Sequence, residues 1–213
     1  MTSAADPLRG LDEVGIPGRR TYLRPVEQSD APLLRFLMND PSVTGTLMGF
    51  NVPVSTEDQR RWTDTPRHSI NGPWHFTIVE RETGRAIGLT TTHTIDWVNR
   101  SAQNGTKIHP DAQRLGLAQD AGMARLAWSF FVVGLRRVSS AVLDYHQASI
   151  RTLEKVGYTY EGRRREAIYR DGRWCDVLLY GLLRAEAERL PWMEEYRRLV
   201  LPVDTTPYIR PPD

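Results

Sequence analysis

The sequence predicts a single domain with a mixed α/β fold, because candidate strands and candidate helices alternate along its 213 residues. The distribution of proline supports this prediction: there are 14 prolines, and none lies between Pro110 and Pro191, so regular elements run there without a break. Both ends are rich in glycine or proline and read as extended segments. We therefore predict an N-terminal arm at residues 1–20, the domain at 21–199 and a proline-rich tail at 200–213.

The first half of the domain is predicted to contain two short helices and then an antiparallel meander. Ser29-Asp30 caps a helix that runs to about Met38, and Ser55 caps a second helix over residues 55–63. The predicted strands of this half cover residues 21–24, 74–80, 86–94 and 102–108.

The second half begins with a long amphipathic helix over residues 116–133, whose apolar positions recur in steps of four and three. Asp171-Gly172 then predicts a tight hairpin turn between two strands. The remaining elements are a strand over 138–145, a helix over 148–156 that Gly157 ends, the hairpin strands 158–169 and 174–183, and a last helix over 184–190.

Charge and cysteine content narrow the functional class. The chain has 28 basic and 26 acidic residues, so the small net charge of +2 argues against a nucleic-acid or membrane partner. All but two of the basic residues are arginines, as expected either from a GC-rich genome or from a surface that binds phosphate or carboxylate groups. The lone cysteine, Cys175, excludes an internal disulfide. With no apolar stretch of signal-peptide or membrane-spanning length, we expect a cytoplasmic protein.

The segment from Gln113 to Ala118 is the first motif with chemical content. A strand ends near Pro110, a short loop follows, and Gly116 opens the long helix. The first N–H groups of a helix lack internal partners and carry partial positive charge, so this loop could hold a diphosphate. The alternative is an ordinary helix that begins with glycine, because the pattern Gln-x-x-Gly-x-Ala alone is weak.

A second motif follows about 30 residues later, and together the two resemble the GNAT acyltransferase superfamily, in its RimJ/RimL-like branch. The resemblance spans roughly residues 20–184 and includes the early Arg24-Pro25 pair and Asp176 after the hairpin turn. The matching positions of the two motifs are Gln113, Gly116, Ala118, Ser149, Glu154-Lys155, Gly157, Tyr158 and Glu161-Gly162.

The resemblance implies a GNAT fold, a twisted and mostly antiparallel sheet of six to seven strands, flanked by helices. Two central strands splay apart and form the cleft for acyl-CoA. Acetyl-CoA is then the acyl donor and a primary amine the acceptor, with no metal; the sequence also shows no Cys/His cluster with metal-ligand spacing. The expected coenzyme-binding residues are Ile108, Gln113, Arg114, Leu115, Gly116, Leu117, Ala118, His146, Ser149, Arg151 and Lys155.

Proton transfer is predicted to depend on Ser149, His146 and Glu166. The branch uses a serine near the departing sulfur, matched by Ser149, whereas the tyrosine of other branches is replaced by Leu153. His146 stands where the family commonly has asparagine, so it is either a coenzyme ligand or an acid–base group. Glu166 is a candidate base if the strand register allows, because alternation along a strand puts it on the same face as Ile168, where RimL-like proteins carry a glutamate. The alternative, which we favour, is a surface ion-pair partner for residues 163–165, all arginines.

The sequence leaves several residue roles open. Gln103 occupies the position of the glutamate that many relatives carry on the fourth strand, and an amide cannot accept the proton. Asp96 and His109 are further candidate bases, and a water chain could replace a single base. The positive pair of Arg151 and Lys155 reads either as a phosphate contact or as a solvated face with Glu154 as partner. Three tryptophans could line the acceptor pocket or belong to the core: Trp62, Trp74 and Trp97.

The leading functional hypothesis is an acetyl-CoA-dependent N-acetyltransferase acting on a small-molecule amine or on the N-terminal α-amine of a protein. A GNAT-fold module that binds acyl-CoA without catalysis, as a sensor or interaction domain, is the alternative, since the strand-four carboxylate is replaced by Gln103. Nucleic-acid binding through arginine is a third reading with little support from the balanced charge. We also expect a homodimer, because extended terminal arms usually lie on a surface.

Overall fold

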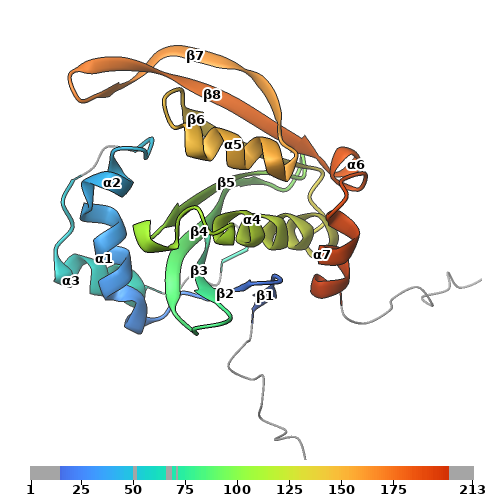
Figure 1. The fold of residues 1–213 in the computed structure, drawn as a ribbon, viewed down its shortest axis with the longest axis horizontal. Helices are drawn as coiled ribbons and strands as arrows, with labels where there is room; N and C mark the ends of the chain where they lie inside the picture. Colours follow the sequence, from blue (N-terminus) through green and yellow to red (C-terminus); the bar gives the residue numbers. More distant parts are fainter. Residues whose placement is uncertain (1–14, 50–51, 66–68, 71, 202–213) are drawn as a thin grey trace, which may run out of the picture.

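The computed structural model describes residues 15–49, 52–65, 69–70 and 72–201. Its centre is one eight-stranded sheet in the order β1-β2-β3-β4-β5-β6-β8-β7 (Figure 1). All neighbouring strands pair antiparallel except β5 and β6. The strands are β1 Ile16–Pro17, β2 Thr21–Pro25, β3 Trp74–Glu80, β4 Ala86–Asp96, β5 Ser101–Ile108, β6 Arg137–Leu143, β7 Thr159–Arg170 and β8 Arg173–Leu183.

This architecture confirms the predicted fold class, with one strand more than expected. The additional strand is β1, which pairs with β2 through Ile16↔Leu23 and Pro17↔Tyr22. Ile16 is buried in the core, so the segment predicted as an arm enters the sheet before residue 21. The predicted tail and the rest of the arm lie outside the described residues.

Seven α-helices surround the sheet within the described part of the chain. Figure 1 shows α1, α2 and α3 gathered at one end of the molecule and α6 and α7 at the other. Their bounds are α1 Ala31–Asn39, α2 Pro41–Thr44, α3 Thr56–Asp64, α4 Leu117–Ala127, α5 Gln147–Val156, α6 Arg184–Ala187 and α7 Met193–Val200.

The predicted caps and turns explain most helix ends. The Ser55 side chain accepts a hydrogen bond from the Asp58 amide and starts α3. Gly157 ends α5 in the left-handed region, at φ 105°, where glycine is favoured. Asp171 and Gly172, at φ 48° and 80°, form the tight turn between β7 and β8.

Three helical segments differ from the prediction. The long helix over 116–133 is α4 followed by a π-helical stretch at Trp128–Val132. The short helix α2 and the helix α7 were not predicted. Helix α7 begins two residues beyond Pro191 and buries Met193 and Tyr196 against the main core, so tertiary packing extends the fold past the proline.

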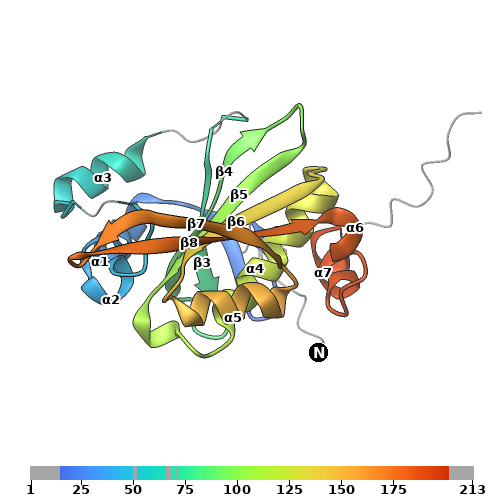
Figure 2. The ribbon, with the colours of Figure 1, turned by 90° about the horizontal axis from the view of Figure 1, so that it is seen from above.

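The sheet separates two apolar layers. Helix α4 contributes Leu117, Ala121 and Ala124 to the larger cluster on one face. On the other face, Leu34 and Leu37 of α1 pack with Leu89 of β4. Helix α3 also contacts α1, so the second layer is built by α1 and α3. Figure 2 shows α3 and α4 on opposite sides of the strands.

The join between β5 and β6 is short. It consists of three register pairs, Ser101↔Arg137, Ala102↔Val138 and Gln103↔Ser139, after which the strands separate. The hydroxyl of Ser140 donates to the carbonyl oxygen of Asn104 at 3.2 Å just beyond the last pair. Because β5 and β6 run parallel, their C-terminal ends lie at the same edge of the sheet. Beyond Gln103 and Ser139 no register pair joins the two strands, and we refer to this unpaired stretch as the opening.

Candidate acyl-CoA site

The backbone of β5 offers hydrogen-bonding groups to this opening. The amide of His109 donates to Ile87 on the β4 side at 2.8 Å. Backbone groups of alternate residues point to opposite sides of a strand, so those of Thr106 and Ile108 turn away from β4. Since the register with β6 ends at Gln103, these groups face the opening. Ile108 therefore lies where the sequence predicts a backbone contact to the acyl group.

The loop from Gln113 to Ala118 follows directly and has the geometry of an anion site. Arg114 and Gly116 adopt left-handed conformations, at φ 61° and 78°. The first helical hydrogen bond of α4 runs from the Asp120 amide to the Gly116 carbonyl at 3.0 Å, so the amides of the three intervening residues lack an i−4 partner. Successive free amides at a helix N-terminus bind phosphate groups.

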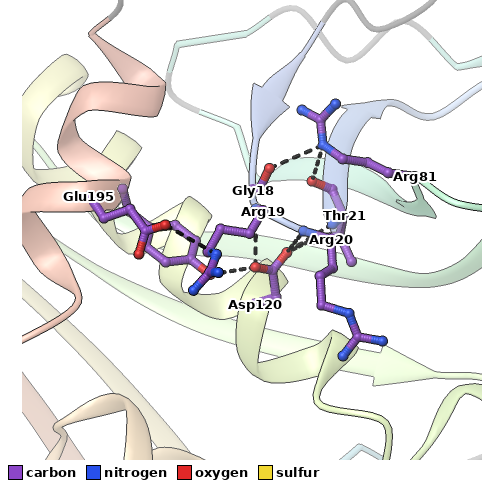
Figure 3. Close-up of polar contacts among 8 residues, drawn as sticks. Gly18, Arg19, Arg20, Thr21, Arg81, Asp120 and Glu195 are labelled. Atoms are coloured by element: carbon purple, nitrogen blue, oxygen red, sulfur yellow. Dashed lines mark hydrogen bonds and ion pairs between the residues drawn. The ribbon is translucent and has the colours of Figure 1, made fainter.

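Asp120 anchors this helix start to the rest of the fold (Figure 3). Its buried carboxylate accepts hydrogen bonds from the amides of Arg19 and Arg20 at 3.1 Å each, and from the amide and hydroxyl of Thr21 at 2.9 and 2.7 Å. The hydroxyl of Tyr196 on α7 donates to the same carboxylate. A negative charge in the first turn also interacts favourably with the positive end of the helix dipole. Asp120 thus fixes the helix that presents the free amides.

Arg20 is a candidate site residue that the sequence prediction missed. Its guanidinium donates to the carbonyl oxygen of Leu115, inside the loop, at 2.6 Å. The same guanidinium lies 3.6 Å from the position that a Cβ on Gly116 would occupy. An exposed cation beside free amides favours a diphosphate. The sequence placed Arg20 in an arm; the pair Arg19-Arg20 directly before the first strand was the signal available.

The opposite wall of the opening is the N-terminus of α5, which carries His146 and Ser149. The His146 amide donates to Leu143, the last residue of β6, at 2.9 Å, and the Ser149 amide donates to His146 at 3.0 Å. The helix start is thereby held at the C-terminal end of β6. The His146 ring is half-buried, and burial lowers its pKa below the usual histidine value. At neutral pH it is therefore an uncharged proton acceptor.

The predicted general base Glu166 is in a different position from that expected. The β7–β8 register passes from Arg164↔Val177 to Ile168↔Cys175, so β7 contains a bulge. Glu166 lies in that bulge at φ 48°, its side chain is exposed, and its amide donates to Asp176. The two-residue alternation that put Glu166 on the face of Ile168 does not hold across a bulge. The argument for Glu166 from strand register was therefore wrong.

The other proposed bases have structural partners. Asp96 accepts hydrogen bonds from the amide and side chain of Asn99, so it closes the turn after β4. His109 stacks on Phe36 of α1 at a centroid distance of 4.5 Å, and its ring accepts a hydrogen bond from the Asp111 amide. Neither contact requires a catalytic role.

His93 is a second candidate that the sequence did not reveal. It pairs with Gln103 across β4 and β5, which places both side chains on the face of α1 and α3, at the last register pair of β5 and β6. Burial, and then the charge of Arg125, lower the pKa of His93. Its ring nitrogen lies 3.0 Å from the Thr94 hydroxyl. Periodicity along β4 was the only sequence signal, and the pairing with Gln103 could not be read from it.

The coenzyme-phosphate hypothesis for Arg151 and Lys155 remains open. Both side chains are exposed, and neither has a salt-bridge partner within the described residues. The local partner proposed for them, Glu154, instead accepts a hydrogen bond from Tyr180 at 3.3 Å.

The three tryptophans separate into two groups. Trp62 of α3 lies edge-on to His75 at 5.0 Å and lines a cavity over β3–β5. Trp74 instead packs against Trp97, with ring centroids 5.9 Å apart. On the α4 side it packs against Trp128, with ring centroids 5.3 Å apart. Of the three, Trp62 is therefore the one that lines this cavity.

The described ranges lack both a membrane-spanning helix and a metal-binding cluster. No helix there is long and apolar enough to cross a membrane. Nor is there a group of three or more His, Cys, Asp or Glu side chains arranged to hold a metal ion.

Comparisons with known proteins place the chain among acetyltransferases. Residues 20–159 match the family model described as the acetyltransferase (GNAT) domain. The uncharacterized N-acetyltransferase YoaA of Bacillus subtilis is 30% identical over 107 residues, which cover 50% of this chain and 60% of YoaA. The spermidine N(1)-acetyltransferase of Vibrio cholerae is 24% identical over 77% of this chain and 93% of its own length.

Solved structures show the same fold. The crystal structure of a spermidine N-acetyltransferase from Vibrio cholerae, in complex with CoA and spermine, has a TM-score of 0.73 at 22% identity, covering 80% of this chain and 99% of that one. A structure of RimL, a ribosomal L7/L12 alpha-N-protein acetyltransferase, in complex with coenzyme A has a TM-score of 0.68 at 20% identity, covering 79% and 97%.

Proposed function

The chain belongs to the GNAT acetyltransferase family, and from this we infer that it is an acetyl-CoA-dependent N-acetyltransferase acting on a primary amine. The observation that carries the assignment is the opening between β5 and β6, which lies next to the free amides of the loop before α4. A pantetheine chain completes the backbone hydrogen bonds that β5 leaves open, and the diphosphate binds the loop and Arg20. No metal is needed.

The reaction is attack of the neutral amine on the thioester carbonyl carbon. A C–N bond forms, the C–S bond breaks, and the amine loses a proton while the departing thiolate gains one. The amide of Ile108 donates to the carbonyl oxygen as negative charge develops there. The hydroxyl of Ser149 donates a proton to the thiolate and regains one from solvent; Leu153, one turn later on the same helix, has no proton to give.

The proton of the amine needs an acceptor. His146 is the first candidate, because burial keeps its imidazole neutral and α5 holds it beside the opening. His93 is the second, opposite Gln103 at the end of the join between the strands. Glu166 is a distant third because of the bulge around it. Deprotonation of the amine by water before binding is the remaining route.

Turnover of acetyl-CoA tests the function. The purified chain is mixed with acetyl-CoA and a panel of primary amines that includes polyamines, small aromatic amines and N-terminal peptides. Release of free thiol and a matching mass increase of one amine are expected. If coenzyme A binds and no amine in a broad panel is acetylated, the alternative of a non-catalytic acyl-CoA-binding module, suggested by Gln103, is correct instead.

Cellular location and assembly are further parts of the proposal. The protein is cytoplasmic, as supported by a single, free and buried cysteine, Cys175. It is a homodimer, as supported by the long edge strand β7, which has most of its side chains exposed and is free to pair with a second copy. A monomeric mass in light scattering at micromolar concentration would refute the dimer.

A further inference from the structure

A cavity of about 390 Å³ lies between helices α1 and α3 and the sheet. Its size suits a small ligand. Leu34, Leu37 and Trp62 supply an apolar wall, and Lys107 of β5 lines the other side. Lys107 directly precedes Ile108, whose amide faces the acyl-CoA opening, so one strand borders both sites. This cavity is therefore a candidate binding site for the acceptor, an inference that rests on the proposed acetyltransferase function.

The ammonium of Lys107 has no compensating negative charge in the described structure. Its Nζ donates to the thioether sulfur of Met38 at 2.9 Å, and a thioether is a weak acceptor. In residues 15–49, 52–65, 69–70 and 72–201, no carboxylate oxygen forms a salt bridge with it. Burial lowers the pKa of Lys107, so the surroundings disfavour an unpaired charge. A ligand anion would pair with this cation.

The other ionisable groups of the cavity do not offset Lys107. Asp58 lines the cavity, but its side chain is exposed. Its carboxylate accepts a hydrogen bond at 2.6 Å from the hydroxyl of Ser55, the residue that caps α3. His75 lies edge-on to Trp62. A polyamine carries several positive charges, and one exposed carboxylate beside a half-buried cation would not balance them.

We propose that the acceptor is a primary amine that also carries an anionic group, such as a carboxylate, and an apolar body, with the anion paired to Lys107 and the body packed on Leu34, Leu37 and Trp62. This class excludes spermidine-like polyamines as the preferred substrate. Lys107 is thus a specificity-determining residue that distinguishes this chain's acceptor from one recognised by acidic side chains alone.

Two probes that differ only in charge test the proposal. para-(Aminomethyl)benzoate and para-(aminomethyl)benzamide share the amine and the ring, and calorimetry gives their affinities for the protein saturated with coenzyme A. The wild type should bind the benzoate about 10-fold or more tightly than the benzamide, the size of a charge-assisted hydrogen bond. Lys107→Met should remove this preference, whereas Arg35→Met, which deletes an exposed positive charge on α1, should preserve it.

The outcomes separate the two proposals. Equal affinities for the probes in the wild type, undetectable binding of both, or an unchanged preference in Lys107→Met would each overturn the anionic acceptor. Acetylation of the benzamide or of spermidine at the same efficiency as the benzoate would do so too, while leaving the acetyltransferase function intact. Failure of the wild type to bind coenzyme A would instead contradict the proposed function, and coenzyme binding by Lys107→Met shows that the variant is folded.

Discussion

The carboxylate of Asp120, in the first turn of α4, accepts a hydrogen bond from the hydroxyl of Tyr196 on α7. This contact joins α7 to the helix that follows the loop from Gln113 to Ala118. It belongs to a network in which the buried Asp120 carboxylate also accepts hydrogen bonds from the backbone amides of Arg19, Arg20 and Thr21 (Figure 3). The loop is therefore held by a residue close to the C-terminus as well as by the first strands.

Tyr196→Phe should lower the free energy of unfolding by about 0.5–1.5 kcal/mol, the net value of one hydrogen bond. Burial, and then the hydrogen bond to Asp120, raise the pKa of Tyr196 well above the usual tyrosine value. A raised pKa means that the folded state holds the proton more tightly, so this stabilisation is present below about pH 10 and is lost as pH rises further. Urea unfolding between neutral and alkaline pH should show a steeper decline for the wild type than for Tyr196→Phe. Parallel curves would contradict the prediction.

Gly116→Trp should abolish coenzyme A binding while the domain stays folded. The substitution forces a side chain onto a residue at φ 78° and places an indole beside the free amides. Gly172→Trp is the matched control, because Gly172 has φ 80°, open surroundings and a position in the β7–β8 turn. Calorimetry should give wild-type affinity for the control. Unchanged affinity in a folded Gly116→Trp protein would remove the diphosphate from this loop.

Arg20→Met should raise the KM for acetyl-CoA about 10-fold and leave kcat nearly unchanged, as expected for a charge-assisted contact to a phosphate far from the reacting atoms. S-acetylpantetheine lacks the diphosphate, so the variant and the wild type should use it equally well. Arg85→Met, which removes an exposed arginine from the β3–β4 turn, serves as the control. An equal loss with both donors would mean that Arg20 acts only by holding Leu115.

Ser149→Ala should slow turnover without a large change in coenzyme affinity, because a group that protonates the thiolate acts in the transition state. Loss of an acid–base group costs about 10²–10⁴-fold in kcat. Single-turnover measurements, in which chemistry limits the rate, give the rate of acyl transfer in the variant and in the wild type. A wild-type rate in Ser149→Ala would exclude this role.

His146→Ala should lower kcat by about 10²–10⁴-fold if the imidazole is the base. Since burial lowers the pKa of His146, the wild-type rate should remain high at neutral pH and decline only below about pH 6.5, where the ring gains a proton. The variant should lack this acidic decline. If His146→Ala keeps the acidic decline, the same pH profile is measured for His93→Ala and Glu166→Ala, and loss of the decline in one of them identifies that residue as the base. A rate that follows the pKa of the acceptor amine in all three variants indicates deprotonation by water.

Local signals in the sequence predicted the elements that local chemistry determines. The cap at Ser55, the helix stop at Gly157 and the turn at Asp171-Gly172 each depend on a few neighbouring residues, and the structure has them where the sequence placed them. The GNAT fold and the loop before α4 were likewise accessible, because two motifs at a fixed spacing support each other.

Features that depend on distant contacts could not be predicted. Arg20 reaches Leu115 across 95 residues, and Asp120 reaches Tyr196 across 76, so nothing near either residue reveals the pair. The bulge around Glu166 is a property of how β7 pairs with β8, and ordinary strand alternation therefore gave the wrong face. The pairing of His93 with Gln103 likewise depends on a register that composition does not contain.

The short contact between β5 and β6 implies that coenzyme bound there would also support the sheet. Within the sheet, three register pairs join strands β1–β5 to strands β6–β8, and the core around α4 packs against both groups. Coenzyme bound in the opening would act as an additional strand joining the two groups. Folding and metabolic state are then linked: at a concentration one hundred times its dissociation constant, a ligand adds about 2.7 kcal/mol to stability. Loss of acetyl-CoA and coenzyme A would remove this added stability together with the substrate.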